Sequence, residues 1–264
     1  MLDQNYPNLE YIIVDGGSTD ESVDIIQRYK PHLAYWVSEP DAGQSNAINK
    51  GMMRATGTIL AWLNSDDYYL PGAFEAIAQA SLAHPAAGAF VGIGEVVNTS
   101  GECLNRVEPP PTIGLETLYN WLDGGDFIQP SCFFRSSAWH AAGPLDEGVH
   151  IAFDVDLWLR MVKAGCVFFT IERLLSQALS HPNAKTVAFT NLMRVDCAIV
   201  VMRHGGEHFA RKHLEDIAMR LSWSEPNLNK ILNNPIVKLL KPWVALFGKP
   251  AADRRDTIPR WLQR

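Results

Sequence analysis

The chain has few cysteines, and none of them are close together. Cys103, Cys132, Cys166 and Cys197 are separated by 29, 34 and 31 residues. This spacing contains no C-x-x-C pair of a zinc knuckle, and it is too sparse for the disulfide framework of a small secreted domain. We therefore expect four reduced thiols, most of them buried in a core.

The sequence also lacks a long apolar run and an excess of positive charge. No stretch approaches the roughly 20 residues that cross a bilayer, and the first residues do not resemble a secretory signal. The 264 residues carry 23 Lys and Arg against 29 Asp and Glu, a net charge of −6. Proteins that neutralise many phosphates need a basic face, so nucleic acid is not expected as a partner. We expect a cytoplasmic protein.

Short apolar runs alternate with amphipathic segments over most of the chain. The segment 9–14 is β-rich and is stopped by Asp15-Gly16-Gly17, and residues 18–29 have the cap and the periodicity of a helix. The same criteria predict strands at 33–37, 58–63, 88–98, 127–135 and 167–171, and helices at 44–55, 71–81, 154–164 and 187–222. This alternation favours an α/β fold with a mostly parallel central sheet and helices on both faces.

Acidic and polar residues follow three of these apolar runs. They are Asp15, Asp41 and Asn64-Ser65-Asp66-Asp67. In an open α/β sheet, ligands bind beyond the carboxyl ends of the strands. Carboxylates that converge on one edge repel one another unless a cation lies between them. The pattern therefore predicts a hard divalent metal, Mg²⁺ or Mn²⁺, at this edge.

Several motifs, in this order and spacing, resemble those of the family 2 glycosyltransferases. They are Asp15-Gly16-Gly17-Ser18-Thr19-Asp20, Glu39-Pro40-Asp41-Ala42-Gly43-Gln44, Asn46-Ala47-Ile48-Asn49-Lys50-Gly51, Leu63-Asn64-Ser65-Asp66-Asp67, Gln129-Pro130-Ser131, Phe153-Asp154-Val155-Asp156 and His181-Pro182-Asn183-Ala184-Lys185-Thr186. The resemblance covers about residues 4–186. It implies the nucleotide-diphospho-sugar transferase (GT-A, Rossmann-like) fold for residues 1–186, followed by a helical C-terminal extension at 187–264.

The resemblance also implies a role for individual residues. Asp15 should hydrogen-bond the nucleobase of a nucleotide-sugar donor, usually uracil, and Asp66 should ligate a metal that bridges the diphosphate. The remaining members of the implied site are Asp41, Asn49, Asn64 and Lys185 around the donor, Asp67 and His181 near the metal, and Gln129 and Asp156 on the acceptor side. Asp154 matches the catalytic base of the family.

Asp154 and Asp156 compete for the role of base. Two residues apart on a helix, their carboxylates point about 200° apart, so only one should face the acceptor. The resemblance favours Asp154, which would take a proton from the acceptor hydroxyl as that oxygen attacks the anomeric carbon. A single displacement inverts the anomeric configuration. The alternative is that Asp154 only caps its helix.

Together these motifs imply a metal-dependent inverting glycosyltransferase. Its donor would be a UDP-sugar and its acceptor a saccharide or a lipid-linked molecule, in the synthesis of cell-surface polysaccharide. The family normally begins with a strand and a helix before Asp3, and this sequence starts after them. A second interpretation therefore stays open, a catalytically impaired sugar-nucleotide-binding or scaffold protein.

One further motif points to different chemistry. His204-Gly205-Gly206-Glu207-His208 fits H-x-x-E-H, the inverted zinc-protease pattern. That pattern needs both histidines on one face of a stable helix, and two adjacent glycines cost about 1 kcal/mol each there. We therefore expect no zinc hydrolase.

The last 35 residues differ in charge from the rest of the chain. Residues 230–264 contain eight Lys and Arg and two Asp, and their apolar residues include Trp243 and Phe247. An apolar stripe beside lysines can lie on a membrane that contains anionic lipid, here the inner face of the plasma membrane. It can equally pack on the catalytic domain, and Pro235 and Pro242 interrupt a continuous helical face. The sequence leaves both interpretations open.

Overall fold

The computed structural model describes residues 1–182, 184 and 190–233. The chain divides into two compact units, Met1–Leu214 and Glu215–Arg264. None of the helices within the described ranges has the length and apolar character that a bilayer crossing requires. The segment proposed for membrane contact, 230–264, lies outside the described residues from 234 onward, so both interpretations of it stay predictions.

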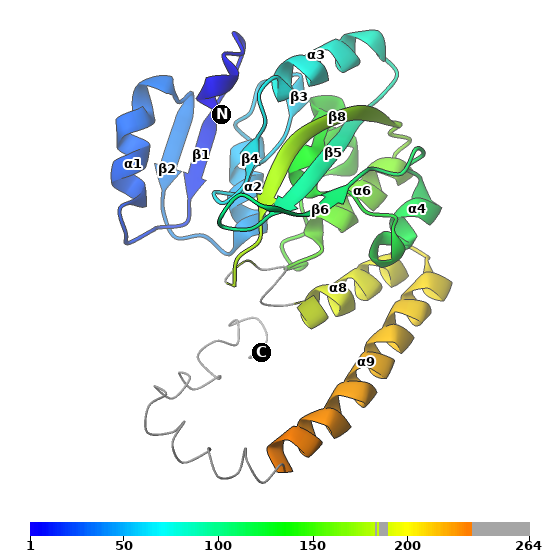
Figure 1. Ribbon diagram of the computed structural model, residues 1–264. Helices are drawn as coiled ribbons and strands as arrows, with labels where there is room; N and C mark the ends of the chain where they lie inside the picture. Colours follow the sequence, from blue (N-terminus) through cyan, green and yellow to red (C-terminus); the bar gives the residue numbers. More distant parts are fainter. Residues whose placement is uncertain (183, 185–189, 234–264) are drawn as a thin grey trace. The chain divides into compact units, whose positions relative to one another are not determined.

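The first unit begins with a small parallel sheet. β1 (Ile12–Asp15) pairs in parallel with β2 (Tyr35–Ser38), and α1 (Ser22–Tyr29) connects the two strands. Short 3-10 helices precede β1 and follow α1, η1 (Leu2–Gln4) and η2 (Lys30–His32). Figure 1 shows this strand–helix–strand element at the blue end of the colour scale. It matches the sequence-based expectation, because β-branched Ile and Val favour the strand and Gly17, at φ 85°, permits the turn.

A second sheet of six strands forms the centre of the unit. Its order is β3-β7-β5-β8-β4, with β6 also paired to β5. The strands are β3 (Ile59–Leu60), β4 (Tyr68–Tyr69), β5 (Ala89–Val97), β6 (Cys103–Val107), β7 (Cys132–Arg135) and β8 (Phe168–Leu179).

This second sheet is mixed, which corrects the expectation of a mostly parallel sheet. Only β5 and β8 pair in parallel, whereas the pairs β3–β7, β4–β8, β5–β6 and β5–β7 are antiparallel. A short connection returns the chain in the opposite direction, as the turn between β5 and β6 does at Asn98–Glu102. The alternation of strands and helices therefore predicted the layers but not the strand directions.

Helices lie on both faces of this sheet. The helices of the described residues after β2 are α2 (Gln44–Met52), α3 (Ala73–Ala83), α4 (Leu115–Tyr119), α5 (Ser136–Ala142), α6 (Phe153–Lys163), α8 (Thr190–Arg203), η3 (Trp121–Asp123) and η4 (Gln129–Ser131), together with α9 (Glu207–Asn233), which continues into the second unit. On β5, Ala89 and Val91 join a core that contains Trp158 of α6, whereas Phe90 joins a second core with Ile77 of α3. Successive strand residues point to opposite faces, so the two cores are the two sides of one sheet.

Three expectations of local structure are corrected. Residues 129–131 form the 3-10 turn η4 rather than the start of a strand, because Pro130 has no N–H to give to a sheet. Strand β8 continues to Leu179, well past the predicted end at 171. Gly205, at φ 90°, and Gly206 separate α8 from α9 inside the predicted helical segment 187–222, so His204 and His208 do not share one helix.

Candidate functional site

A cavity of about 1630 Å³ is bordered by β1, β3 and the polar segments that follow them. Consecutive residues of both strands line it. Alternate side chains of a strand point to opposite faces, so a cavity on one face would contact every second residue. This cavity contacts consecutive residues, and it therefore lies along the edges of the two strands. Within the described part of the chain, β1 pairs only with β2 and β3 pairs only with β7, so each of the two strands has one edge without a partner strand. The expected site residues that line the cavity are Asp15, Asn64, Asp66, Asp67, Gln129 and Asp154.

Asp15 lies at the carboxyl end of β1 and organises the turn that follows. Its carboxylate accepts hydrogen bonds from the N–H groups of Gly17 (3.1 Å) and Ser18 (2.9 Å) and from the hydroxyls of Ser18 and Ser38. The Ser18 and Ser38 hydroxyl bonds lower the pKa of Asp15 to about 2. Asp15 is therefore ionised at neutral pH and remains an acceptor on the cavity wall.

Asp41 lies against this turn. A Cβ atom on Gly16 would stand 2.7 Å from Asp41 Oδ2, so a side chain at this position would require the Asp41 carboxylate to move. The structure thus places Asp41 against Gly16, the residue after Asp15, but not on the cavity wall, and its role at the donor stays a prediction.

Asn49 has a different place from the one implied by the resemblance. It is buried on α2 and does not line the cavity. Its amide nitrogen donates to the Leu145 carbonyl (3.0 Å) and to Glu147 (3.1 Å), and its amide oxygen accepts from the Leu145 N–H (2.9 Å). Since these bonds hold the loop before α6, we do not carry Asn49 into the proposed donor site.

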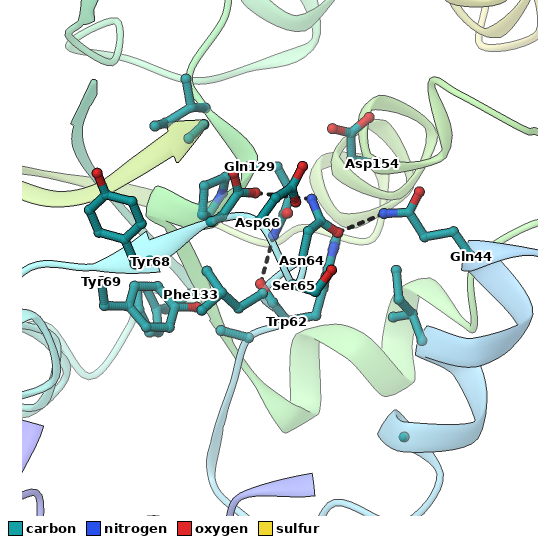
Figure 2. A pocket seen from close by; sticks show the side chains of 18 of the residues that line it. Gln44, Trp62, Asn64, Ser65, Asp66, Tyr68, Tyr69, Gln129, Phe133 and Asp154 are labelled. Atoms are coloured by element: carbon teal, nitrogen blue, oxygen red, sulfur yellow. Dashed lines mark hydrogen bonds between the residues drawn. The ribbon is translucent and has the colours of Figure 1, made fainter. Parts of the chain in front are cut away.

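Asn64 joins the polar segment after β3 to helix α2. Its amide oxygen accepts a hydrogen bond from Gln44 Nε2 (2.6 Å), and its amide nitrogen donates to Asp67 Oδ2 (3.1 Å). Figure 2 shows Gln44 reaching toward Asn64 from one side of the cavity. Asp67 Oδ1 also accepts from the Leu179 N–H (3.1 Å) at the end of β8. Asn64 and Asp67 therefore fix this segment between α2 and β8.

Asp66 pairs with His181. His181 Nε2 lies 3.1 Å from Asp66 Oδ2. The neighbouring Asp67 is mostly buried, and its burial together with the negative charge of Asp66 raises the pKa of Asp67 to about 6. No group of three His, Cys, Asp or Glu side chains converges as a metal cluster in the part of the chain that the structure describes. The donor set still fits Mg²⁺ or Mn²⁺, because such ions are commonly held by one or two carboxylates and completed by substrate phosphates and water. Lys185, the other expected residue of this loop, lies outside the described residues.

Gln129, the first residue of η4, lines the cavity. Its amide nitrogen donates to the Trp62 carbonyl (2.9 Å), a bond drawn in Figure 2. Its buried amide oxygen has no hydrogen-bond partner among the described residues. A buried acceptor without a partner is costly, so a ligand hydroxyl at this point would be stabilising.

Asp154 lies in the first turn of α6 and lines the cavity. Figure 2 shows its carboxylate above Asn64 and Gln44, on the helix that crosses the view. Burial raises the pKa of Asp154 to about 6, and the negative charge of Asp196 adds to that shift. A carboxylate with a raised pKa is a better proton acceptor, as general base catalysis requires.

The Asp156 carboxylate points toward His204 and Arg160 and not into the cavity. Asp156 is 5% exposed, does not line the cavity, and bonds to His204 Nε2 (2.9 Å) and Arg160 Nε (2.8 Å). Although burial opposes ionisation, these two hydrogen bonds hold the pKa of Asp156 below its ordinary value. We therefore keep Asp154 as the proposed base and assign Asp156 to the hydrogen bond with His204 that joins α6 to the end of α8.

The structure adds functional candidates that the sequence did not single out. Ser18 and Ser38 hold Asp15, Gln44 holds Asn64, and Asp196 accepts two backbone hydrogen bonds from the residues before α6. Ser18 and Gln44 stand within the motifs quoted above, and Ser38 ends a predicted strand, so sequence position could have marked them. Asp196 lies in a helical segment that contains none of the quoted motifs, and the residues that it bonds lie more than 40 positions earlier in the chain.

Comparison with known proteins identifies the family of the chain. The model of the family described as "Glycosyl transferase family 2" matches residues 1–140. An uncharacterized glycosyltransferase of Rickettsia typhi is 26% identical over 200 residues, which cover 72% of this chain and 61% of that protein. The chain thus spans about three fifths of the length of this relative.

Solved structures share the fold. The structure of residues 1–349 of S. aureus TarS in complex with UDP aligns with a TM-score of 0.56 at 16% identity, over 75% of this chain and 59% of that chain. The mannosyltransferase PcManGT from Pyrobaculum calidifontis, in complex with GDP-Man and Mn²⁺, aligns with a TM-score of 0.53 at 19% identity, over 99% of this chain and 78% of that chain. The nucleotide-diphospho-sugar transferase fold is therefore confirmed, and the chain belongs to glycosyl transferase family 2.

Proposed function

We propose that the chain transfers a sugar from a nucleoside-diphosphate donor to a hydroxyl of a saccharide or lipid-linked acceptor, with inversion at the anomeric carbon. The observation that carries the proposal is that one cavity is lined by Asp15, Asp66 and Asp154. These three carboxylates come from three separate segments of the chain, and they suit three different tasks. A role in making cell-surface polysaccharide is the cellular context that we propose for this activity.

The donor is proposed to be a UDP-sugar. Ionised Asp15 can only accept hydrogen bonds, and uracil presents an imide N–H that can donate one. The fold is shared with TarS, which has been solved with UDP, and with PcManGT, which has been solved with GDP-Man. Guanine also presents a ring N–H, so GDP is the second nucleotide to test.

A divalent cation is proposed to bind with the donor. Asp66, Asp67 and His181 would hold it, with the diphosphate oxygens completing the coordination. When bound, the ion neutralises the charge that grows on the diphosphate as the glycosidic bond breaks. We place Lys185 in the same role on the basis of the motif alone.

Asp154 is proposed to be the base. It takes the proton of the acceptor hydroxyl while that oxygen attacks the anomeric carbon from the side opposite the diphosphate. The new carbon–oxygen bond forms as the bond to the diphosphate breaks, so the configuration inverts. The orphaned amide oxygen of Gln129 would accept a hydrogen bond from a sugar hydroxyl and help to orient it.

Calorimetry of UDP binding tests the donor site. We expect binding in the presence of Mn²⁺ and a loss of at least tenfold in EDTA, because the phosphates would otherwise face Asp66 and Asp67 directly. The variant Asp66→Ala should bind UDP with weak and metal-independent affinity. Asp24→Ala, which removes an exposed carboxylate on α1, is the control and should bind like the unmodified protein. Equal affinity in EDTA and in Mn²⁺ would contradict the metal assignment.

A binding protein without transfer activity is the second candidate. The edge of β1 next to Asp15 has no second partner strand among the described residues, and an incomplete sheet gives a less ordered donor site. A screen of UDP- and GDP-sugars with Mn²⁺ distinguishes the two candidates. Release of nucleoside diphosphate supports the enzyme, whereas metal-dependent UDP binding without release from any donor supports the binding protein.

A further inference from the structure

The two backbone N–H groups that directly precede helix α6 are held by a carboxylate from a distant helix, and we call this contact the Asp196 cap. Asp196 Oδ2, on α8, accepts hydrogen bonds from the backbone N–H groups of Ile151 (2.9 Å) and Ala152 (3.0 Å). These residues directly precede α6, whose start has no cap hydrogen bond from the side chain of its own N-cap residue, Ala152. Backbone N–H groups shielded from water need such an acceptor.

The capped backbone leads straight to the proposed base. Asp154 follows Ala152 by two residues, in the first turn of α6, and its carboxylate lines the cavity. A shift of the backbone at 151–152 therefore moves the Asp154 carboxylate with it. A displacement of about 1 Å at a reacting group can cost two orders of magnitude in rate.

Helix α8, which carries Asp196, packs tightly against α6. Cys197 and Val200 of α8 belong to the same buried core as Leu157 and Trp158 of α6. At the other end of α8, His204 lies 2.9 Å from Asp156 of α6. Since α8 is joined to α6 by a shared core and by this hydrogen bond, the position of the Asp196 carboxylate is fixed relative to Asp154.

We propose that Asp196 is a positioning residue for the transfer reaction, which holds the backbone of residues 151–152 so that Asp154 faces the acceptor side of the cavity. This inference rests on the proposed role of Asp154 as base. Asp196 touches neither donor nor acceptor in this account and acts only through the backbone and through its charge.

The charge of Asp196 gives a second, separable effect. Burial is the main cause of the raised pKa of Asp154, and the negative charge of Asp196 raises it further. Among the described residues, the Cys132 thiol on β7 and the Cys197 thiol on α8 are also coupled to Asp154, and Arg194 of α8 and Asp126 line the same cavity. Removing the charge of Asp196 should lower the pKa of Asp154, whatever happens to the hydrogen bonds.

Two variants of Asp196 separate the hydrogen bonds from the charge. Asp196→Asn keeps an oxygen that can accept both N–H groups but removes the charge, whereas Asp196→Ala removes both. Glu10→Ala is the matched control. Glu10 Oε2 also accepts two consecutive backbone N–H bonds, from Thr56 (2.7 Å) and Gly57 (3.1 Å), but on the loop before β3.

Hydrogen exchange and NMR titration of the Asp154 carboxyl carbon report the result without an assay for activity. In Asp196→Ala, the amides of Ile151 and Ala152 should exchange at least ~10-fold faster, and in Asp196→Asn they should stay near the unmodified rate. The pKa of Asp154 should fall in both variants and stay unchanged in Glu10→Ala. Because burial is the main cause of the raised pKa of Asp154, a loosened helix start would also lower it, so Asp196→Asn, in which the amides of Ile151 and Ala152 stay protected, is the variant that isolates the effect of the charge.

Turnover with a donor from the screen completes the test. Asp196→Ala should lower kcat ~10-fold or more at unchanged donor KM, and Asp196→Asn should retain most of kcat above pH 7. If Asp196→Ala leaves the exchange of residues 151–152 and the pKa of Asp154 unchanged, the inference is wrong. If the exchange rate and the pKa both change while Asp154→Asn still transfers sugar, the role of Asp196 in holding residues 151–152 is supported and the proposed base is wrong.

Discussion

β1 and β5 are both apolar strands of the same unit, but they are packed very differently. β5 has strands on both sides, β8 on one and β7 and β6 on the other, and its first six residues are buried. β1 pairs only with β2 among the described strands, and all four of its residues are half-buried. The first sheet therefore lacks both the hydrogen bonds and the burial that stabilise the second.

The difference separates the two halves of the candidate site. Asp15, the proposed donor contact, lies on the loosely packed sheet, whereas Asp154, the proposed base, lies on a helix anchored in the larger core. Regions with few buried contacts open locally at low cost, and ligand-binding segments are often drawn from them. We therefore expect donor binding to order the first sheet, while the base is held in place before any ligand arrives.

The largest expected effect is the loss of transfer in Asp154→Asn. The amide keeps the shape of the side chain but cannot take a proton, so the transfer rate should fall roughly 10²-fold or more. Affinity for UDP with Mn²⁺, measured by calorimetry, should stay within about twofold of the unmodified protein.

Asp15→Asn is the matched variant on the other sheet. It should weaken UDP binding by about tenfold or more, because the amide replaces an ionised acceptor that holds Ser18 and Ser38. If Asp15→Asn lowered the rate without affecting UDP affinity, the assignment of the two tasks to the two regions would be wrong.

Hydrogen exchange should report the packing difference directly. We expect the protected amides of β1 to exchange roughly 10²-fold faster than those of β5, because local opening of β1 disrupts one strand pair and little core. UDP with Mn²⁺ should slow exchange in β1 and leave β5 nearly unchanged. Equal protection of the two strands without ligand would remove the basis of the comparison.

The same Val→Ala substitution on each strand should measure how much packing contributes to stability in the two sheets. Val91, on β5, is fully buried, whereas Val14, on β1, is half-buried. Val91→Ala should lower the free energy of unfolding by about 2 kcal/mol, from lost transfer and a residual cavity, and Val14→Ala by less than ~1 kcal/mol. Urea denaturation measures both, and equal losses would show that β1 is as well packed as β5.

The smallest expected effect is in pH dependence. The base must be ionised to act, and the pKa of Asp154 is raised to about 6, so kcat should fall as the pH drops through about 6. At pH 5 the expected loss is roughly tenfold. The pKa of Asp15 is lowered to about 2, so Asp15 stays ionised through this range and should cause no parallel loss of UDP affinity. An acid limb that persists in an active Asp154 variant would assign it to another group.

Local structure and residue chemistry could largely be predicted from the sequence. The strand–turn–helix at 12–29 follows from β-branched residues, a glycine turn and helical periodicity within a short segment. Strand β6, Cys103–Val107, was not predicted, because four of its five residues are exposed and leave no apolar alternation. Its place depends on pairing with β5 across a turn, which no pattern within the segment records.

The motifs by themselves determined which side chains could carry the chemistry, because acidic residues at strand ends are a local property of the chain. Only the tertiary structure decided which of them meet. It brought Asp15, Asp66 and Asp154 to one cavity, committed Asn49 to the loop at Leu145, and turned Asp156 toward His204. It also supplied the cap at Asp196, 44 residues from Ala152. The physical reason is that these partners are joined by packing across the core, and the energy of such contacts depends on residues far apart in the chain.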